Sequence, residues 1–154
     1  MTEAIGLLEI EGLVAAIEGL EMGAVNGKRP LCIGVTQLTS TSKEAMNDEL
    51  GIPGEVLDCV VNYAKNAKEA GLDGVVCSPL EVKLVKEACG KEFVTVTPGI
   101  RLASNNADDQ VRITTPAKAR EIGSDYIVVG RPITQAENPV EAYHLILKEF
   151  LGNE

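Results

Sequence analysis

Four short apolar runs alternate with helical patterns along this chain of 154 residues, and this alternation limits the folds that it can adopt. The runs are continuous rather than alternating in polarity, which is typical of strands buried on both faces of a parallel sheet. The segments between them carry apolar residues at helical spacing, so the sequence predicts an α/β protein in β-α-β-α order. The predicted strands cover residues 31–35, 74–77, 93–96 and 126–129.

Several predicted helices begin at a capping residue that is followed by proline. Ser78-Pro-Leu-Glu81 has the pattern of a capping box with proline at the first helical position, and Asn138-Pro-Val-Glu141 repeats it. Thr115 precedes Pro116 in the same way. Further helices are predicted over residues 10–22 and 54–70. A short helix is predicted to begin at residues 41–44 and to end at residues 51–53, whereas residues 1–9 show no clear pattern.

The number of strand–helix units limits the architecture. An eight-stranded β/α barrel takes about 250 residues, so four units in this length are close to half a barrel. An open doubly wound sheet of four strands also fits the count. Polar residues gather just after the predicted strands, which favours the barrel because barrel enzymes place their sites at that face. The sequence therefore predicts a partial TIM-type (β/α) barrel of about four parallel strands, as a single domain over residues 1–154.

The composition argues against several classes of partner and site. A net charge of −9 without any cluster of Lys or Arg argues against nucleic acid and against an anionic membrane as partners. No apolar stretch approaches the roughly 20 residues of a transmembrane helix, and the first residues lack the basic region of a signal peptide. Cys32, Cys59, Cys77 and Cys89 form no CxxC pair, and His144 is the only histidine, so we expect buried thiols and no metal site. These features predict a reducing, cytoplasmic location.

Two predicted strands near the C-terminus end at glycine and arginine. One leads into Pro98-Gly-Ile-Arg101, and the last leads into Gly130-Arg131. Backbone N–H groups beside glycine and a guanidinium fork are the two devices that hold a phosphate dianion. We therefore interpret Gly130 and Arg131 as a phosphate grip, with a loop arginine lying over a helix end as the alternative.

Three other polar residues are candidates for ligand contacts. Arg101 follows a Pro-Gly turn that would aim its side chain over the barrel mouth, and a structural arginine fits the same spacing. Gln110 lies in the polar segment 104–113, the natural place for a flap over a ligand, where a solvated loop glutamine is the alternative. The Thr39 hydroxyl could hydrogen-bond a base edge, and turn and cap duties suit it equally. His144 has no partner at ligand spacing, so we interpret it as a packed or surface histidine.

Five blocks of this sequence have the order and spacing of blocks in a known family. They are Val35-Thr-Gln-Leu-Thr-Ser-Thr41, Gly74-Val-Val-Cys-Ser-Pro79, Val96-Thr-Pro-Gly-Ile-Arg101, Asp108-Asp-Gln-Val-Arg112 and Val129-Gly-Arg-Pro-Ile-Thr134. Together they resemble the bacterial orotidine 5′-phosphate decarboxylases, from about Ala15 to the C-terminus. The matching part is the second half of that family's barrel, with its strands five to eight. The resemblance implies loss of CO2 from orotidine 5′-phosphate to give uridine monophosphate, without a metal or an organic cofactor.

The resemblance assigns the phosphate side of the site to three residues. Arg131 and the backbone amide of Gly130 would hold the 5′-phosphate, helped by Gln110 from the flap. Phosphate binding energy that is realised in the transition state can organise a cofactor-free reaction, which agrees with this assignment.

The resemblance assigns the nucleoside side to three further residues and leaves the catalytic side empty. Arg101 matches the substrate-contacting arginine of the family's Pro-Gly-Ile-Arg block, Thr39 would contact the pyrimidine, and Pro98 would wall the pocket. The family's catalytic lysine and aspartates lie in an Asp-x-Lys-x-x-Asp block, and this sequence has no such spacing. Without a lysine to protonate the developing carbanion, we expect no catalytic residue here and no decarboxylation by the chain alone.

Half of a barrel leaves two strand edges open, so we expect a homodimer or larger self-association through these edges, or pairing with a missing N-terminal half. The first nine residues do not continue the family pattern, as a truncated reading frame would explain. One alternative function is a non-catalytic half-barrel that binds nucleotides or phosphosugars or serves only in assembly. Another is a phosphate-gripping barrel such as a hexulose-phosphate synthase, which shares Gly130-Arg131 but does not explain residues 37–41 or Asp109-Gln110.

Overall fold

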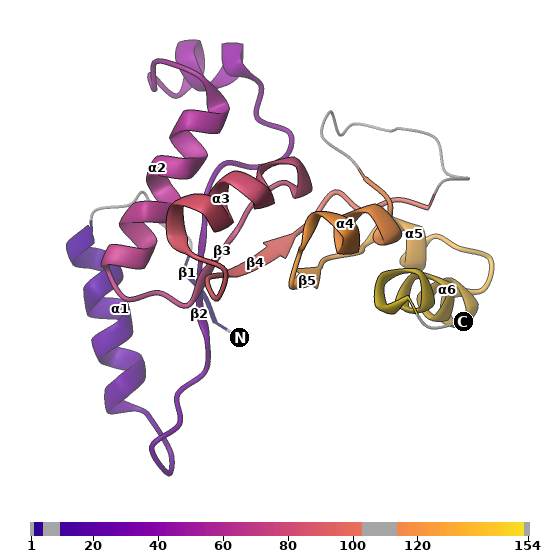
Figure 1. Ribbon diagram of the computed structural model, residues 1–154, viewed down its shortest axis with the longest axis horizontal. Coiled ribbons are helices and arrows are strands. Elements are labelled where there is room, and N and C mark those ends of the chain that lie inside the picture. Colours follow the sequence, from indigo (N-terminus) through magenta and orange to yellow (C-terminus); the bar gives the residue numbers. More distant parts are fainter. Residues whose placement is uncertain (1, 5–9, 103–113, 153–154) are drawn as a thin grey trace.

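The chain folds around one parallel sheet (Figure 1). The computed structural model describes residues 2–4, 10–102 and 114–152. Within these residues the sheet has five strands in the order in which they occur in the chain, and every neighbouring pair is parallel. The strands are β1 (Thr2–Ala4), β2 (Cys32–Val35), β3 (Gly74–Val76), β4 (Val94–Thr97) and β5 (Tyr126–Ile127).

The four strands predicted from the sequence are present, and β1 precedes them at one edge of the sheet. It lies in the segment for which the sequence showed no clear pattern, and its residues Thr-Glu-Ala form no apolar or β-branched run. Thr2 pairs with Cys32, and Ala4 pairs with Gly34. Pairing with β2 therefore specifies β1, whereas local propensity does not.

Helices connect the strands. Figure 1 shows α1, α2 and α3 around the first strands, and α4, α5 and α6 around β5 at the other end. Nowhere in the described part of the chain does a helix combine the length and apolar character that a membrane span requires. The helices are α1 (Ile10–Met22), the π-helix η1 (Ala45–Glu49), α2 (Val56–Glu69), the 3-10 helix η2 (Pro79–Glu81), α3 (Val82–Cys89), α4 (Pro116–Ile122), α5 (Arg131–Thr134) and α6 (Pro139–Leu151).

The helix starts predicted at Ser78, Thr115 and Asn138 are confirmed, whereas η1 begins without a side-chain bond from its capping residue, Glu44. The Ser78 side chain accepts a backbone hydrogen bond at the start of η2, and the Glu81 carboxylate accepts the N–H of Ser78 at 2.7 Å. The side chains of Thr115 and Asn138 likewise each accept the N–H of the third residue after them. These bonds satisfy N–H groups that have no partner inside the helix.

The strand order identifies the architecture. Right-handed crossovers between strands that always step in the same direction place all the connecting helices on one face of the sheet. In agreement, Cys32 and Val75, which share a face, are buried against Val60 and Ala64 of α2 and Val85 of α3. A doubly wound sheet would reverse its order and carry helices on both faces. The chain is therefore a partial β/α barrel, and the doubly wound alternative is wrong.

Asp73, directly before β3, ties the amino end of that strand to β2. Its Oδ2 accepts hydrogen bonds from the Cys32 N–H at 2.7 Å and from Arg29 Nη1 at 2.6 Å. Its Oδ1 accepts a hydrogen bond from Arg29 Nη2 at 3.2 Å. Burial disfavours the charged carboxylate, but the hydrogen bonds from Arg29 and Cys32 outweigh it and hold the pKa of Asp73 below its usual value. Gly71, with φ of 87°, ends α2 and leads into this contact.

Asp125 repeats this arrangement directly before β5. Its Oδ2 accepts hydrogen bonds from the Thr95 N–H at 2.7 Å and from the Thr95 hydroxyl at 2.9 Å. It also accepts a hydrogen bond from Lys86 Nζ at 2.6 Å. Burial again opposes ionisation, and the bonds from Lys86 and Thr95 still lower the pKa of Asp125. Gly123, with φ of 96°, ends α4 two residues earlier. Each aspartate thus joins its own strand to the preceding one.

Candidate functional site

Five of the six predicted site residues lie at the carboxyl edge of the sheet. Thr39 follows β2, Pro98 and Arg101 follow β4, and Gly130 and Arg131 follow β5. Since β4 and β5 are hydrogen-bonded neighbours, their two loops leave the sheet side by side. The strand β3 separates them from β2 and its following turn. The structure therefore brings the two glycine–arginine segments together, as the carboxyl edge of parallel strands requires.

The loop after β4 is bent by the Pro98-Gly99 pair. Gly99 has a φ of 81°, in the left-handed region that glycine adopts readily. The N–H of Arg101 donates to the Thr114 carbonyl at 2.9 Å, and the N–H of Thr114 donates to the Gly99 carbonyl at 3.1 Å. The Arg101 guanidinium is half-buried and donates through Nη1 to the carbonyl of Ile100 at 3.0 Å. These bonds hold the backbone of Arg101 in the loop at the carboxyl edge of the sheet.

The loop after β5 presents Gly130 and Arg131. The N–H of Val128 donates to the Thr97 carbonyl at 3.0 Å, which extends the strand pairing to the foot of this loop. Gly130 is exposed, and a Cβ placed on it would meet nothing within 4 Å. Arg131 is half-buried and begins α5, followed by Pro132 in the first turn. The strand-end position of the pair is confirmed, and the open space leaves room for a ligand.

The turn after β2 holds Thr39 in a buried position. Gln37, two residues earlier, is buried as well, and its Nε2 donates to the Sγ of Cys59 on α2 at 3.6 Å. The pKa of Tyr63 is raised, because burial and the nearby Cys59 outweigh a hydrogen bond with Gln37 that lowers it. Gln37 carries a polar amide close after a buried strand, a signal from which its role could have been predicted. This cluster fixes the turn that carries Thr39.

The remaining site predictions concern single residues. Gln110 lies outside the described residues, so its role as a flap stays a prediction. His144 is exposed on α6, with its ring 5.6 Å from that of Tyr143, which confirms the interpretation as a surface histidine. Three of the four cysteines are buried free thiols as predicted, whereas Cys59 is partly exposed. Among the residues that the structure describes, no group of His, Cys, Asp or Glu is placed to hold a metal ion.

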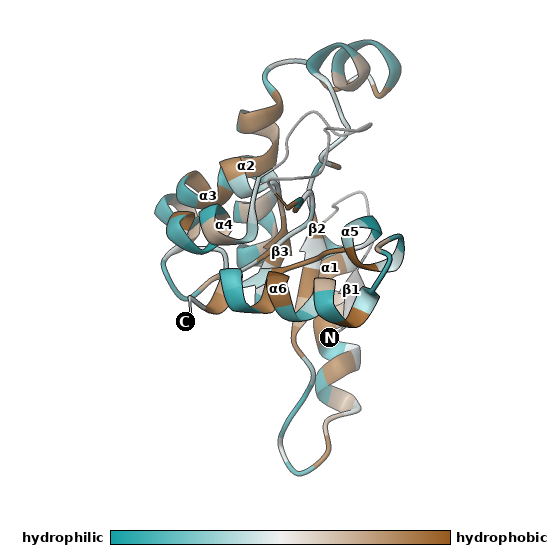
Figure 2. Cartoon of the chain, turned by 90° about the vertical axis from the view of Figure 1, so that its right-hand side faces the viewer, coloured by the Kyte–Doolittle hydropathy of each residue, from teal (hydrophilic) through white to brown (hydrophobic). Residues whose placement is uncertain are grey.

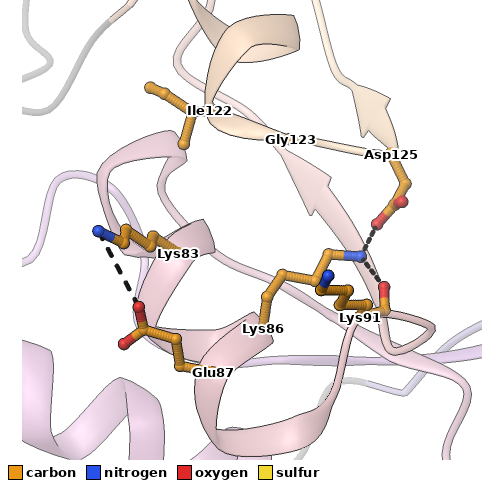
Figure 3. A pocket seen from close by; sticks show the side chains of 7 residues that line it. All are labelled: Lys83, Lys86, Glu87, Lys91, Ile122, Gly123 and Asp125. Carbon is orange, nitrogen blue, oxygen red and sulfur yellow. Dashed lines mark hydrogen bonds and ion pairs between the residues drawn. The ribbon is translucent and has the colours of Figure 1, made fainter.

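A pocket of about 390 Å³ lies at the opposite, amino edge of the sheet (Figure 3). Lys86 crosses it and donates to Asp125 and, at 2.8 Å, to the carbonyl of Lys91. Lys83 lies 4.0 Å from Glu87 on the same helix. Because two of its three lysines have an acidic partner, the pocket offers little net positive charge to an anion. Its contacts indicate a structural role in joining α3 to β4 and β5.

Comparison with known proteins decides the family. The model of the orotidine 5′-phosphate decarboxylase / HUMPS family matches residues 1–146. The chain belongs to this family. The match begins at residue 1, upstream of Ala15, so the expectation that the first nine residues leave the family pattern is wrong.

Curated relatives of this family member are close in sequence and longer. An orotidine 5′-phosphate decarboxylase of Bacillus mycoides (strain KBAB4) is 62% identical over 139 residues, which cover 90% of this chain and 58% of the relative. The same values hold for the Bacillus cereus (strain B4264) enzyme. The chain therefore spans less than two thirds of the length of the curated relatives that it matches.

Solved structures give the same result. The structure of orotidine 5′-phosphate decarboxylase from Lactobacillus acidophilus has a TM-score of 0.82 and 41% identity, and the match covers 97% of this chain and 62% of that one. An uncharacterized conserved protein from Geobacillus kaustophilus has a TM-score of 0.75 and 44% identity over 92% of this chain and 59% of its own. The family member described here thus corresponds to part of a β/α barrel.

Proposed function

We propose that this chain forms the phosphate and nucleoside side of an orotidine 5′-phosphate decarboxylase site and binds orotidine 5′-phosphate or uridine monophosphate. The observation that carries the proposal is the family match over residues 1–146, combined with two glycine–arginine loops side by side at the carboxyl edge of the sheet. In β/α barrels that edge carries the active site.

The chemistry of the candidate residues supports these roles. A guanidinium fork beside an open glycine backbone suits a phosphate dianion, so Arg131 and Gly130 hold the 5′-phosphate, with Gln110 closing over it. Arg101 contacts the substrate from the neighbouring loop, and Thr39 offers a hydroxyl to the pyrimidine. Pro98, at the foot of the Arg101 loop, walls the pocket.

In this proposal the chain does not catalyse decarboxylation by itself. Cofactor-free loss of CO2 leaves a carbanion that needs a positioned acid, and the sequence contains no Asp-x-Lys-x-x-Asp block to provide one. Binding without turnover is therefore the expected behaviour of the isolated chain. The activity belongs to an assembly that also contains the part of the relatives that this chain does not match.

Calorimetric titration with uridine monophosphate tests the ligand site. Replacing Arg131 by alanine removes a charge-assisted contact worth about 2 kcal/mol, so affinity should fall about 30-fold. The matched control is Arg120→Ala, because Arg120 is an exposed arginine in the last turn of α4 that donates to the Glu149 carbonyl. Equal affinity of the Arg131 variant and the unmodified chain would sink the phosphate assignment.

A decarboxylation assay tests the division of labour. The chain is assayed with orotidine 5′-phosphate alone and after mixing with the separately produced N-terminal part of the Bacillus mycoides relative. We expect turnover only in the mixture. Turnover by the chain alone would show that its own residues include the catalytic acid.

Two further proposals concern assembly and location. The outer strands β1 and β5 end the sheet in the described part of the chain, and open edges favour a homodimer or larger assembly, which sedimentation analysis tests. All four cysteines are free thiols, which supports a reducing cytoplasmic location.

A further inference from the structure

The loop from α1 to β2 contains a two-residue β-hairpin with Asn26 and Gly27 at its centre, and we call these two residues the hairpin tip. The N–H of Val25 donates to the Lys28 carbonyl at 3.2 Å, and the N–H of Lys28 donates to the Val25 carbonyl at 3.1 Å. Asn26 and Gly27 have φ of 54° and 72°, in the left-handed region that the centre of a type I′ turn requires. Asn-Gly strongly favours this turn, so the local sequence specifies the hairpin.

The hairpin tip is exposed to solvent. Figure 2 shows the loop between α1 and β2 extending beyond the sheet and the other helices, as does Figure 1. Residues 25–28 are all exposed, and a Cβ built on Gly27 would meet nothing within 4 Å. The two hydrogen bonds of the turn use the N–H groups of Val25 and Lys28 and leave that of Gly27 without a partner. The Gly27 nitrogen and the adjacent Asn26 side-chain amide therefore meet water rather than packed protein atoms.

These two groups are the reactants of a cyclisation. The backbone nitrogen of Gly27 attacks Cγ of the Asn26 amide, so an N–C bond forms while the bond from Cγ to the side-chain nitrogen breaks. The proton of the Gly27 N–H leaves with that nitrogen as ammonia, and a succinimide ring remains. Water then opens the ring, which gives aspartate when it adds at the side-chain carbonyl and isoaspartate when it adds at the main-chain carbonyl. Water is the only co-reactant, and nothing is oxidised or reduced.

Asn26 is the only asparagine of the sequence that is followed by glycine. A side chain on the following residue hinders the approach of its nitrogen, and glycine has none. Asn62 and Asn66 lie in α2, where the N–H groups are held in helical hydrogen bonds. Asn138 precedes Pro139, which has no N–H to lose. Sequence and fold together therefore distinguish the hairpin tip from these other positions.

We propose that the hairpin tip is a deamidation site, at which the folded chain converts Asn26 to isoaspartate and aspartate. In the type I′ turn the backbone of Asn26 must rotate before the Gly27 nitrogen reaches Cγ. Two backbone hydrogen bonds oppose that rotation, and the residues of the turn are exposed rather than packed. Exposed segments of this kind open at low free energy. The reaction therefore requires local opening of the hairpin and not unfolding of the sheet.

Isoaspartate at this position weakens the fold. It adds one atom to the main chain, so Val25 and Lys28 lose the spacing that pairs them. The next residue, Arg29, donates to both carboxylate oxygens of Asp73 before β3, and a displaced hairpin disturbs this link. Aspartate changes the charge but keeps the turn, since Asp-Gly also favours type I′ geometry. The inference is independent of the proposed ligand site, because the reaction and its effect are measured without nucleotide.

The test follows the folded chain during incubation at mildly alkaline pH. Trypsin releases residues 1–28, in which Asn26 is the only side-chain amide, so a mass gain of this peptide reports the reaction at one residue. An isoaspartyl-specific carboxyl methyltransferase then labels isoaspartate and leaves aspartate unlabelled. Asn26 should react at least about tenfold faster than Asn62 or Asn66. A peptide 1–28 whose mass changes only after the chain is unfolded in urea would overturn the inference.

Matched variants test the mechanism and its effect. Gly27→Ala places a side chain beside the attacking nitrogen and should slow the reaction at least about tenfold, with circular dichroism to check that the variant folds. The control is Gly19→Ala, because Gly19 also has nothing within 4 Å of an added Cβ and does not follow asparagine, so the rate should stay unchanged. An unchanged rate in Gly27→Ala would refute the proposed reaction.

The effect on the fold is measured by calorimetry on the isoaspartyl form, isolated by chromatography. Its melting temperature should be lower than that of the unmodified chain. Asn26→Asp carries the added charge without the extra main-chain atom, so its melting temperature should match the unmodified chain. An isoaspartyl form as stable as Asn26→Asp would contradict the link from the hairpin to Arg29 and Asp73.

Discussion

Replacing Asp73 by alanine should destabilise the fold, because it removes a partly buried carboxylate that accepts three hydrogen bonds. Asp73 holds the Cys32 N–H at 2.7 Å and both Nη atoms of Arg29. Hydrogen bonds to a charged group contribute about 1.5–3 kcal/mol each when buried, and exposed ion pairs contribute less than about 1 kcal/mol. The side chains of Arg29 and Asp73 are 21% and 24% exposed, so we expect a loss of about 2.5 kcal/mol.

Urea unfolding at pH 7 measures this loss, and calorimetry should show a melting temperature lower by about 5–10 °C. Asp73→Asn keeps an oxygen that accepts the Cys32 N–H but loses the charge, so it should cost about half as much. The control is Glu121→Ala, which removes an exposed partner of Lys118 and should leave the melting temperature unchanged.

The pH dependence of the same variant gives a sharper test. The folded-state pKa of Asp73 lies below its unfolded value, so the carboxylate stabilises the fold fully above the unfolded pKa of about 4. That contribution is lost as the pH falls through the lower folded pKa. The difference between Asp73→Ala and the unmodified chain should therefore shrink in acid. A difference that is equal at pH 7 and pH 3, or below about 0.5 kcal/mol at pH 7, would refute the reasoning.

Two further substitutions test the packing of the sheet and the capping of a helix. Gly74→Ala should destabilise the fold by about 3 kcal/mol in urea unfolding, because a Cβ on Gly74 would overlap the Val94 carbonyl, and an unchanged midpoint would contradict the close approach of β3 and β4. Ser78→Ala should lower the free energy of unfolding by about 1 kcal/mol in the same measurement, since the Ser78 side chain caps η2. Glu81→Ala should then destabilise the Ser78→Ala variant less than it destabilises the unmodified chain, because the two residues cap the helix together.

The sequence predicted most of the elements because their signals are local. The helix at 10–22 was predicted with the bounds that α1 has, and the caps at Ser78, Thr115 and Asn138 were identified from their own side chains and the following proline. The predicted carboxyl-edge positions of Arg101 and Arg131 were also confirmed, since a residue that follows a parallel strand must lie at that edge.

The sequence missed features that depend on a distant partner. β1 has no strand pattern of its own and exists through its pairing with β2, some thirty positions further along the chain. Gln37 was assigned no individual role from the sequence, and only the packing of α2 against the turn after β2 buries it beside Cys59.

What the sequence by itself determined is the order of strands and helices, their caps and the family blocks, because each is encoded within a few neighbouring residues. Tertiary structure alone decided the single covered face of the sheet and the links from Asp73 to Arg29 and from Asp125 to Lys86. These links join residues 44 and 39 positions apart. No local pattern specifies such pairs, since their partners meet only when parallel strands and their crossovers bring them together.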